Sequence, residues 1–386
     1  MKQNFFAQIF RLCLLTLASV GAARAPAVEK IDVFKQGEHG FAHYRIPGLV
    51  VTAKGTVLAY CEARKNDRED WGEIEVHLRR SVDGGKTWGA VQHVAHNAPR
   101  IEGNPKKKVG GEHEQTVNNP VAIVDRDGTV HFLYCVNYTR CFYQRSKDDG
   151  LTFTAPVEIT SAFAGFGRRN VIATGPGHGI QLATGRLLVP VWVGSDRADD
   201  PAKHEAATIY SDDHGQTWKA GDIAIPQDGE FLRPNECSVV QLSDGSVMMN
   251  ARTESKTNRR AVTTSPDGVS RWAAPRFDDA LWDAICMGSL TTPPQAPGVV
   301  LFATTHNLKL DEKGQWVPGA RAPRRNLSVN LSRDDGKTWA ASKPLEPGSS
   351  AYSDLAVLPD GTILCFYEKY RDLTLARFSL EWAGQP

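Results

Sequence analysis

A short motif returns along this chain at nearly regular intervals, and it constrains the possible fold more than any other feature. Four copies have the pattern Ser-x-Asp-x-Gly-x-Thr followed by Trp or Phe, and a degraded fifth copy begins at Ser265. Successive copies start 65, 65, 54 and 67 residues apart, so each interval has room for several strands. The four intact copies begin at Ser81, Ser146, Ser211 and Ser332.

A second motif alternates with the first: a glycine turn followed by a run of apolar, β-branched and aromatic residues. Such runs between Asp-Gly turns are typical of strands, and no long stretch has the apolar period of a helix. Units of about 60 residues that cannot bury both faces alone predict an all-β, six-bladed β-propeller with four-stranded antiparallel blades. The strand at 373–380 is expected to complete the blade that the N-terminus begins. The six glycines are Gly55, Gly128, Gly185, Gly245, Gly298 and Gly361.

The repeated box has a structural explanation. Its Ser and Asp side chains can accept hydrogen bonds from their own turn, and its Gly can adopt a positive φ. The terminal aromatic ring can bury against the sheet. We therefore expect the boxes to form outer turns of the blades and to do no chemistry.

The first 25 residues read as a secretory signal peptide, because Lys2 and Arg11 precede an apolar run and Ala23-Arg24-Ala25 fits a cleavage site. The run at 12–23 is too short to cross a membrane. We expect an exported protein, periplasmic or extracellular, with residues 26–386 forming one domain. Its cysteines are too few for a disulfide scaffold; Cys135 and Cys141 could bridge a hairpin, although buried thiols are favoured.

The charge of the chain is nearly balanced, at a formal net value of +1. This balance argues against a polybasic surface for nucleic acid or anionic membrane. Individual arginines stand near the ends of expected inner strands, among them Arg45, Arg64, Arg252 and the pair Arg324–Arg325. Several of them at one mouth of a propeller would concentrate positive charge and predict an anion site.

At these residues the sequence resembles the exo-α-sialidase (neuraminidase) family. The resemblance covers residues 30–382 and combines the boxes with four short motifs. It implies that Arg45, Arg252 and Arg324 bind the substrate carboxylate, with Arg325 as the alternative to Arg324. It also implies that Glu368 holds Arg45. The four motifs are Tyr44-Arg-Ile-Pro47, Pro234-Asn-Glu-Cys237, Asn250-Ala-Arg252 and Ala351-Tyr-Ser-Asp354.

The family's chemistry explains the remaining residue types. Sialic acid carries a carboxylate on its anomeric carbon, which would repel an anionic nucleophile, and sialidases use a tyrosine instead. A phenol with a pKa near about 10 needs a neighbouring base. The resemblance places the nucleophile at Tyr352, the base at Glu236 and the general acid at Asp70, with Asp67 as the alternative acid. Arg64 would then touch the ring hydroxyls.

The sequence therefore predicts a retaining exo-α-sialidase that releases terminal sialic acid from sialylated glycoproteins, glycolipids or oligosaccharides, with no cofactor or metal. The alternatives are a glycan-binding propeller without turnover, a trans-sialidase and a hydrolase of a related nonulosonic acid. The presence of Tyr352, Glu236 and Asp70 together favours an enzyme over a lectin. Trp71, Trp192 and Phe166 are candidates either for walls of the sugar pocket or for packing between blades.

Overall fold

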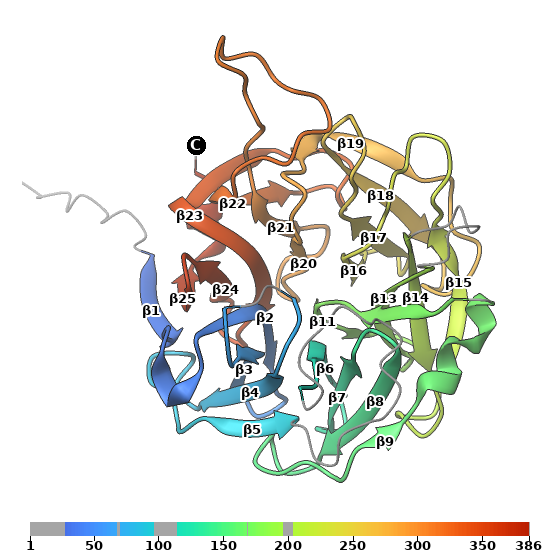
Figure 1. The fold of residues 1–386 in the computed structure, drawn as a ribbon, viewed down its shortest axis with the longest axis vertical. Coiled ribbons are helices and arrows are strands. Elements are labelled where there is room, and N and C mark those ends of the chain that lie inside the picture. Colours follow the sequence, from blue (N-terminus) through green and yellow to red (C-terminus); the bar gives the residue numbers. More distant parts are fainter. Residues whose placement is uncertain (1–27, 68–69, 96–113, 168, 196–203, 386) are drawn as a thin grey trace, which may run out of the picture.

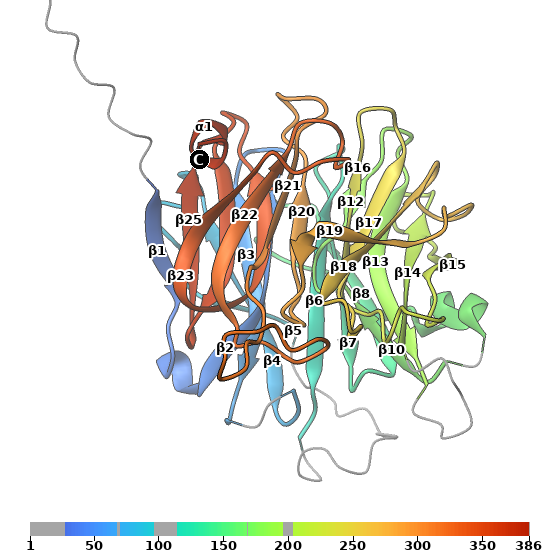
Figure 2. The ribbon, with the colours of Figure 1, turned by 90° about the horizontal axis from the view of Figure 1, so that it is seen from above.

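The computed structural model describes residues 28–67, 70–95, 114–167, 169–195 and 204–385. Within these ranges the chain forms β-sheets arranged as a ring around a central axis (Figure 1). Seen from the side, most strands run between the two faces of a disc (Figure 2). The predicted signal peptide at 1–25 lies outside the described residues. None of the helices in the described part of the chain is long and apolar enough to span a bilayer.

Four sheets of four or five strands follow one another around the ring. The first comprises β2 (His43–Val51), β3 (Val57–Arg64), β4 (Ile74–Ser81) and β5 (Gln92–Ala95). The second comprises β6 (Val117–Val124), β7 (Val130–Val136), β8 (Arg140–Ser146), β9 (Val157–Glu158) and β11 (Gly177–His178). The third comprises β10 (Val171–Thr174), β12 (Ile180–Gln181), β13 (Leu187–Gly194), β14 (His204–Ser211) and β15 (Lys219–Ile225). The fourth comprises β16 (Cys237–Gln241), β17 (Val247–Ala251), β18 (Arg259–Ser265) and β19 (Arg276–Trp282).

The fifth sheet has seven strands and closes the ring. Its β23 is 17 residues long and pairs with β22 up to Ser349 and with β24 from Ser350 onward. N-terminal β1 pairs antiparallel with β25, as expected for the strand near 373–380. The remaining elements are short: η1 (Glu38–Gly40), η2 (Thr160–Phe166) and α1 (Leu380–Ala383). The strands of this sheet are β20 (Ser289–Thr291), β21 (Val300–Thr305), β22 (Arg325–Ser332), β23 (Ala341–Val357), β24 (Ile363–Lys369), β25 (Asp372–Phe378) and β1 (Glu29–Phe34).

The prediction of an all-β, propeller-like ring is therefore confirmed, whereas the hydrogen bonding does not separate six four-stranded blades. The physical reason is β23: its backbone stays extended from Ala341 to Val357, so the last two repeat units share one continuous strand. Short strands β9, β11 and β12 also bring two of the smaller sheets to five strands.

Each box forms the turn between two consecutive antiparallel strands at the periphery of the ring (Figure 1), and the five pairs are β4–β5, β8–β9, β14–β15, β18–β19 and β22–β23. In the first copy, Ser81 Oγ donates to Asp83 at 2.7 Å and accepts from the Gly85 N–H at 2.8 Å. Asp83 also accepts from the N–H and hydroxyl of Thr87 at 2.9 and 2.6 Å. Equivalent contacts recur around Asp148, Asp213 and Asp334.

The fourth residue of three boxes reaches the glycine turn of the preceding sheet. At this position the backbone has a positive φ, between 56° and 66°, which aims the side chain away from its own turn. A box therefore joins neighbouring sheets as well as closing its own hairpin. The contacts are Asp149 with Thr56 at 2.6 Å, His214 with Asp125 at 2.7 Å and Asp335 with the Ser243 hydroxyl at 2.6 Å.

The apolar core lies between neighbouring sheets. One cluster joins Val121 and Leu133 of the second sheet to Val189 and Ile209 of the third, and β3 is buried along its whole length. All six cysteines of the described residues are free and buried, and Cys135 lies opposite Cys141 across the β7–β8 hairpin. This packing fixes the strand ends around the axis, where the candidate site lies.

Candidate active site

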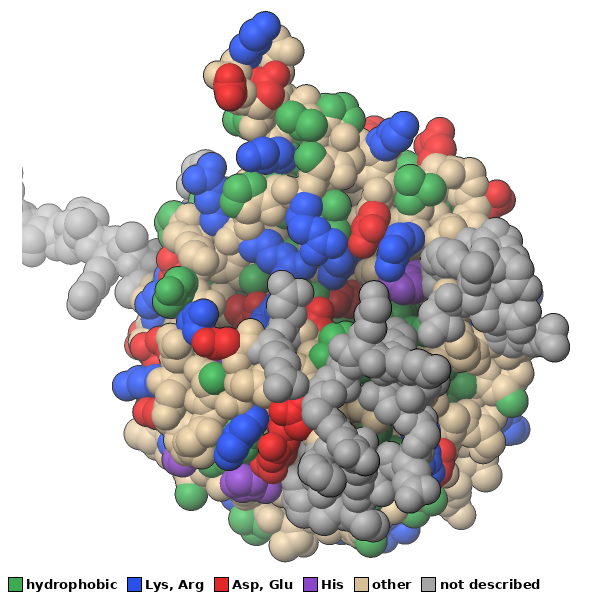
Figure 3. All heavy atoms as spheres, viewed as in Figure 1, with side chains coloured by type: hydrophobic (Ala, Val, Ile, Leu, Met, Phe, Trp, Pro, Cys, Tyr) green, Lys and Arg blue, Asp and Glu red, His purple; other side chains and the backbone are tan. Residues whose placement is uncertain are grey.

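All five sheets contribute side chains to one cavity of about 540 Å³ at one end of the central axis. On the corresponding face, basic side chains gather around the centre with acidic ones beside them (Figure 3). Its walls combine many charged groups with a few aromatic rings. The cavity is lined by Arg45, Asp70, Trp71, Tyr138, Val171, Trp192, His204, Arg233, Asn235, Glu236, Arg252, Glu254, Arg321, Arg324 and Tyr352.

Arg45 enters the cavity from a β-bulge in β2. The register with β3 shifts between Arg45 and Gly48, and Pro47 fits there because it has no N–H to pair. Glu368 of β24 holds the guanidinium from behind, accepting from Nε at 3.1 Å and Nη2 at 3.2 Å, and also accepts the Ile46 N–H at 3.0 Å. Burial raises the pKa of Glu368, but Arg45 and this N–H outweigh it, so the pKa is lowered. Glu368 is therefore a fixed anion.

Tyr352 and Glu236 meet on the floor of the cavity. Tyr352, 5 % exposed on β23, donates its hydroxyl to Oε1 of Glu236 at 2.5 Å. Nη1 of Arg252 donates to Oε2 of Glu236 at 2.6 Å and to the Tyr352 oxygen at 3.1 Å. Burial, and then Glu236, raise the pKa of Tyr352 well above its usual value despite three nearby arginines. The phenol is therefore protonated at neutral pH, and Glu236 is placed to accept its proton.

Two guanidinium groups lie close to the Tyr352 ring, with Arg45 5.3 Å and Arg324 5.1 Å from its centroid. Nη2 of Arg324 donates to the Ile285 carbonyl at 3.0 Å. Arg324, at the approach to β22, lines the cavity, whereas Arg325 is exposed and begins the strand. Of the two neighbours that the sequence left open, Arg324 is therefore the one that faces the cavity.

Arg324 differs from the other arginines of the site in its charge balance. Arg45 is paired with Glu368, Arg64 with Glu62 and Arg252 with Glu236. Within the described ranges, no carboxylate lies in salt-bridge distance of Arg324. A guanidinium that is largely buried without an anionic partner favours an anionic ligand.

Asp70 lines the cavity, whereas Arg64, at 1 % exposed, is buried behind it and is not one of the lining residues. The buried Arg64 donates from Nε and Nη2 to Glu62 at 3.1 and 2.7 Å, and from Nη1 to Asp70 at 3.2 Å. The Asp70 side chain is 53 % exposed and also lies 3.6 Å from Arg45. The alternative, Asp67, pairs instead with Arg371 at 2.9 Å and does not line the cavity.

Aromatic rings form a continuous wall on one side. The centroid of Tyr138 lies 5.0 Å from Trp71 and 5.8 Å from Trp192, which in turn lies 4.8 Å from His204. Trp71 and Trp192 were candidates from sequence, whereas Phe166 packs into the core between the second and third sheets. Tyr138 and His204 were not predicted. No motif marked Tyr138 in the sequence; the structure places it in a turn with Asn137, in which both residues have a positive φ.

Other unpredicted residues support the site. Asp283 is fully buried and accepts the N–H groups of Thr253, Ile285 and Cys286 at 3.0, 2.8 and 3.2 Å. Because Thr253 follows Arg252 and the Ile285 carbonyl binds Arg324, this one carboxylate fixes the backbone beside two arginines of the site. At the rim, Glu254 lies 3.6 Å from both Arg233 and Arg321.

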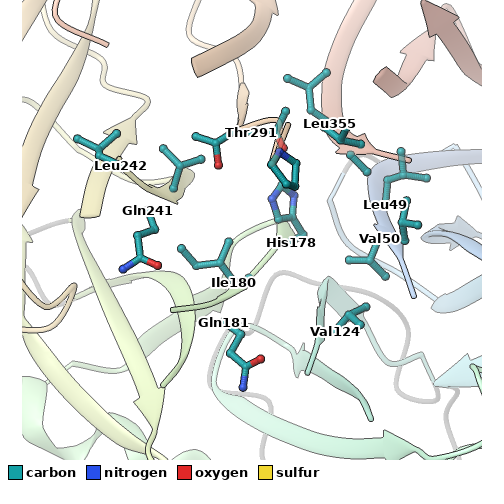
Figure 4. Close-up of a pocket in the computed structure, with 17 residues that line it drawn as sticks. Leu49, Val50, Val124, His178, Ile180, Gln181, Gln241, Leu242, Thr291 and Leu355 are labelled. Atoms are coloured by element: carbon teal, nitrogen blue, oxygen red, sulfur yellow. The ribbon is translucent and has the colours of Figure 1, made fainter. Parts of the chain in front are cut away.

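A second cavity of about 460 Å³ lies at the other end of β2, around Val50 and Leu355 (Figure 4). Three of its polar side chains, those of His178, Gln181 and Gln241, already have partners in the structure. His178 pairs with Asp354 at 2.7 Å, Gln181 donates to Asp125 at 2.8 Å, and Gln241 accepts the Ala183 N–H at 2.8 Å. The charged, incompletely paired groups thus gather in the first cavity.

Comparison with known proteins agrees with this geometry. The model of the BNR repeat-like domain family matches residues 55–365. The sialidase of Micromonospora viridifaciens is 30 % identical over 95 % of this chain and 56 % of its own length. The Bacteroides fragilis sialidase is 28 % identical over 88 % of this chain and 62 % of its own length. This chain thus spans less than two thirds of these two relatives, but Sialidase-2 of Cricetulus griseus is 28 % identical over 94 % of this chain and 98 % of its own.

Solved structures share the fold. A Hadza microbial sialidase superposes with a TM-score of 0.73 at 24 % identity, over 91 % of this chain and 68 % of its own. The intramolecular trans-sialidase from Ruminococcus gnavus, in complex with oseltamivir carboxylate, gives 0.71 at 19 % identity, over 92 % and 99 %.

Proposed function

Because the chain belongs to the exo-α-sialidase family with BNR (Asp-box) repeats, we propose that it is a retaining exo-α-sialidase acting on terminal α-linked sialic acid. The observation that most supports this activity is the 2.5 Å hydrogen bond between Tyr352 and Glu236, in a cavity that also holds Arg324, which has no carboxylate partner among the described residues. The site for an anion lies directly beside a tyrosine hydroxyl that is hydrogen-bonded to a carboxylate base. This arrangement fits a sugar whose carboxylate is attached to the reacting carbon.

In the proposed first step, Arg45, Arg252 and Arg324 bind the sugar carboxylate, while the buried Arg64 positions Asp70 through the hydrogen bond from Nη1. The Tyr352 oxygen attacks the anomeric carbon and its proton passes to Glu236. Asp70 protonates the leaving oxygen as the glycosidic bond breaks. Nη1 of Arg252 lies 3.1 Å from the Tyr352 oxygen, so it can stabilise negative charge that develops there.

In the proposed second step, Asp70 takes a proton from water, and the water oxygen attacks the anomeric carbon. The bond to Tyr352 breaks, and the phenolate recovers its proton from Glu236. Two displacements on opposite faces return the original anomeric configuration. Every proton taken in the first step is therefore returned in the second, and neither step needs a cofactor.

Release of a fluorophore from an aryl α-sialoside tests this proposal. We expect turnover by the wild type, a loss of at least about a hundredfold for Tyr352→Phe, and no change for Tyr370→Phe. Tyr370 is a matched control because it is 76 % exposed and does not line the cavity. No release by the wild type, or full activity in Tyr352→Phe, would refute the proposed enzyme; binding of sialosides without release would indicate a lectin.

The alternative reaction is transfer of the sialic acid instead of its hydrolysis. One solved structure with a similar fold is an intramolecular trans-sialidase, which is why this alternative is tested. Product NMR on a sialyl oligosaccharide distinguishes free sialic acid from an anhydro sugar or a newly sialylated acceptor. We expect free sialic acid. Sialylated glycoproteins, glycolipids and oligosaccharides are the proposed substrates.

Two structural expectations belong to the same proposal. We count the seven-stranded sheet as two blades joined through β23, which gives one six-bladed domain over residues 26–386. We also propose export directed by residues 1–25. Sequencing the N-terminus of protein recovered outside the cytoplasm tests the export, because a chain that still begins at Met1 would contradict it.

A further inference from the structure

Three side chains with metal-binding groups come together on the outer strands of the first sheet. Glu75 and His77 are two residues apart on β4 and so share one face, and His93 lies directly opposite His77 on β5. Oε2 of Glu75 is 3.3 Å from Nε2 of His77 and 3.0 Å from Nδ1 of His93. One ligand atom from each residue lies within 4.8 Å of the other two.

These separations are close to those of ligands around one small cation. Zinc binds histidine nitrogen and carboxylate oxygen at about 2.0–2.2 Å in tetrahedral geometry, which places neighbouring ligand atoms about 3.3–3.5 Å apart. The observed distances of 3.0 and 3.3 Å need only a small adjustment to reach that spacing.

The surroundings hold two of the three ligands in place and leave the third accessible. His77 is fully buried, with its ring 4.6 Å from Phe41 and 5.8 Å from Tyr44. The Glu75 side chain is 18 % exposed, whereas His93 is 52 % exposed. Histidine side chains are visible on the surface over β4 and β5 at the lower left of Figure 3. A cation can therefore enter past His93 and keep a water as its fourth ligand.

We propose that Glu75, His77 and His93 form a binding site for a divalent transition metal of the Zn²⁺ type. Imidazole nitrogens favour Zn²⁺ over Ca²⁺ and Mg²⁺, which prefer oxygen ligands. The bound ion links the short edge strand β5 to β4. It also restrains the segment that carries Asp70, because that segment ends where β4 begins at Ile74.

A second cluster in the described residues lacks these properties. Asp125, Asp127 and His214 also lie near one another, but this set offers one histidine. The carboxylate of Asp125 also accepts a hydrogen bond from outside the cluster, from Gln181 at 2.8 Å. We interpret this cluster as the contact between sheets described above.

Calorimetric titration of metal-free, tag-free protein tests the proposal. We expect one Zn²⁺ per chain and binding of Ca²⁺ at least about a hundredfold weaker. Zn²⁺ should also raise the Tm of the wild type by about 2 °C or more, because a ligand that binds only the folded state stabilises it. No saturable Zn²⁺ binding would overturn the site.

Variants then locate the ion. His93→Asn is the principal variant because an exposed side chain can be changed without disturbing the core, and Glu75→Gln is the second. We expect each to weaken Zn²⁺ binding at least about tenfold and to lose the Tm shift. His306→Asn, which removes a histidine packed 4.6 Å from Trp282 outside this cluster, is the control and should bind as the wild type. Unchanged Zn²⁺ affinity in both cluster variants would place the ion elsewhere and refute the proposal.

Discussion

Arg64 and Asp70 form a hydrogen-bonded ion pair in the candidate site, with 3.2 Å between Nη1 and Oδ1. Burial raises the pKa of Asp70, but Arg64 and Arg45 together outweigh burial, so this pKa lies below its usual value. In the free protein Asp70 is therefore deprotonated at neutral pH, although the proposed first step needs its acid form. A substrate carboxylate that neutralises Arg45 and Arg324 would raise the pKa of Asp70 when it binds.

The first prediction concerns the pH dependence of sialyllactose cleavage. A general acid works in its protonated form, so activity falls as pH rises through its pKa. The profile of kcat/KM reports the free enzyme, where this pKa is low, and the profile of kcat reports the complex. We expect the alkaline limb of kcat to lie at higher pH than that of kcat/KM. Coincident limbs would contradict proton uptake by Asp70 on binding.

The second prediction separates Asp70 from Asp67. Asp70→Ala should slow cleavage of sialyllactose far more than cleavage of an aryl sialoside, because a good leaving group hardly needs a proton. Asp67→Ala is the matched control, since Asp67 pairs with Arg371 outside the cavity. Measuring kcat/KM for both substrates with both variants decides the assignment. Equal losses on the two substrates would remove Asp70 from the role of acid.

The third prediction concerns the adjacent arginines 324 and 325. Arg324→Ala should weaken binding of a carboxylate-bearing sialic acid analogue by roughly 10- to 150-fold, since a hydrogen bond to a charged group contributes about 1.5–3 kcal/mol. Arg325→Ala should leave the affinity unchanged, because Arg325 is exposed at the start of β22. Competition against a fluorogenic substrate measures both constants. The reverse result would mean that the arginine register is wrong by one residue.

The repeat made the fold predictable because each box encodes its own turn. Ser81, Asp83, Gly85 and Thr87 form a closed set of local hydrogen bonds, so spacing along the chain translates into hairpins around a ring. The merging of the last two units was not predictable, since Pro347-Gly348 within Ala341–Val357 is a local turn signal that favours a break, and yet the strand continues through it. The contact of His214 with Asp125 was equally hidden, because it joins different sheets.

The candidate site was predictable only where a motif marks it. The family resemblance singled out Tyr352 and Glu236, which are 116 residues apart and yet share a hydrogen bond. Glu62 is two residues before Arg64 on β3, so the period of a strand already places the two side chains on one face. Asp283 acts on the backbone beside Arg252 and Arg324 through buried contacts that depend on three-dimensional packing, so no spacing in the sequence announces it. Tyr138 reaches the cavity through a turn of the second sheet, whose direction only the assembled ring determines.

The fourth prediction treats Asp283 as a positioning residue. Asp283→Ala removes the acceptor for the N–H groups of Thr253 and Ile285, so the segments that hold Arg252 and Arg324 should shift. We expect KM to rise more than kcat falls, at temperatures well below the lowered Tm, and Asp283→Asn to restore part of the affinity. Asp278→Asn is the control, since Asp278 is also buried but accepts from Trp339 outside the cavity. A lower Tm with unchanged KM would show a purely structural role.

The fifth prediction is a covalent adduct on Tyr352. Attack on the anomeric carbon must come from the face opposite the leaving oxygen, and Tyr352 and Asp70 are both part of the cavity lining but come from different sheets. Fluorine at C3 of a sialic acid analogue destabilises the positive charge that develops in both transition states, so both steps become slower. A good leaving group at C2 restores the rate of the first step only. The intermediate should therefore accumulate, and peptide mass spectrometry should find the sugar on Tyr352.

In Glu236→Gln the adduct should form more slowly, because the phenol, whose pKa burial already raises, loses the group that accepts its proton. NMR of the first product formed from natural substrate should show retained α configuration. An inverted product, or an adduct on Glu236 itself, would replace the tyrosyl mechanism with a direct displacement or a carboxylate nucleophile, even in a protein that releases sialic acid.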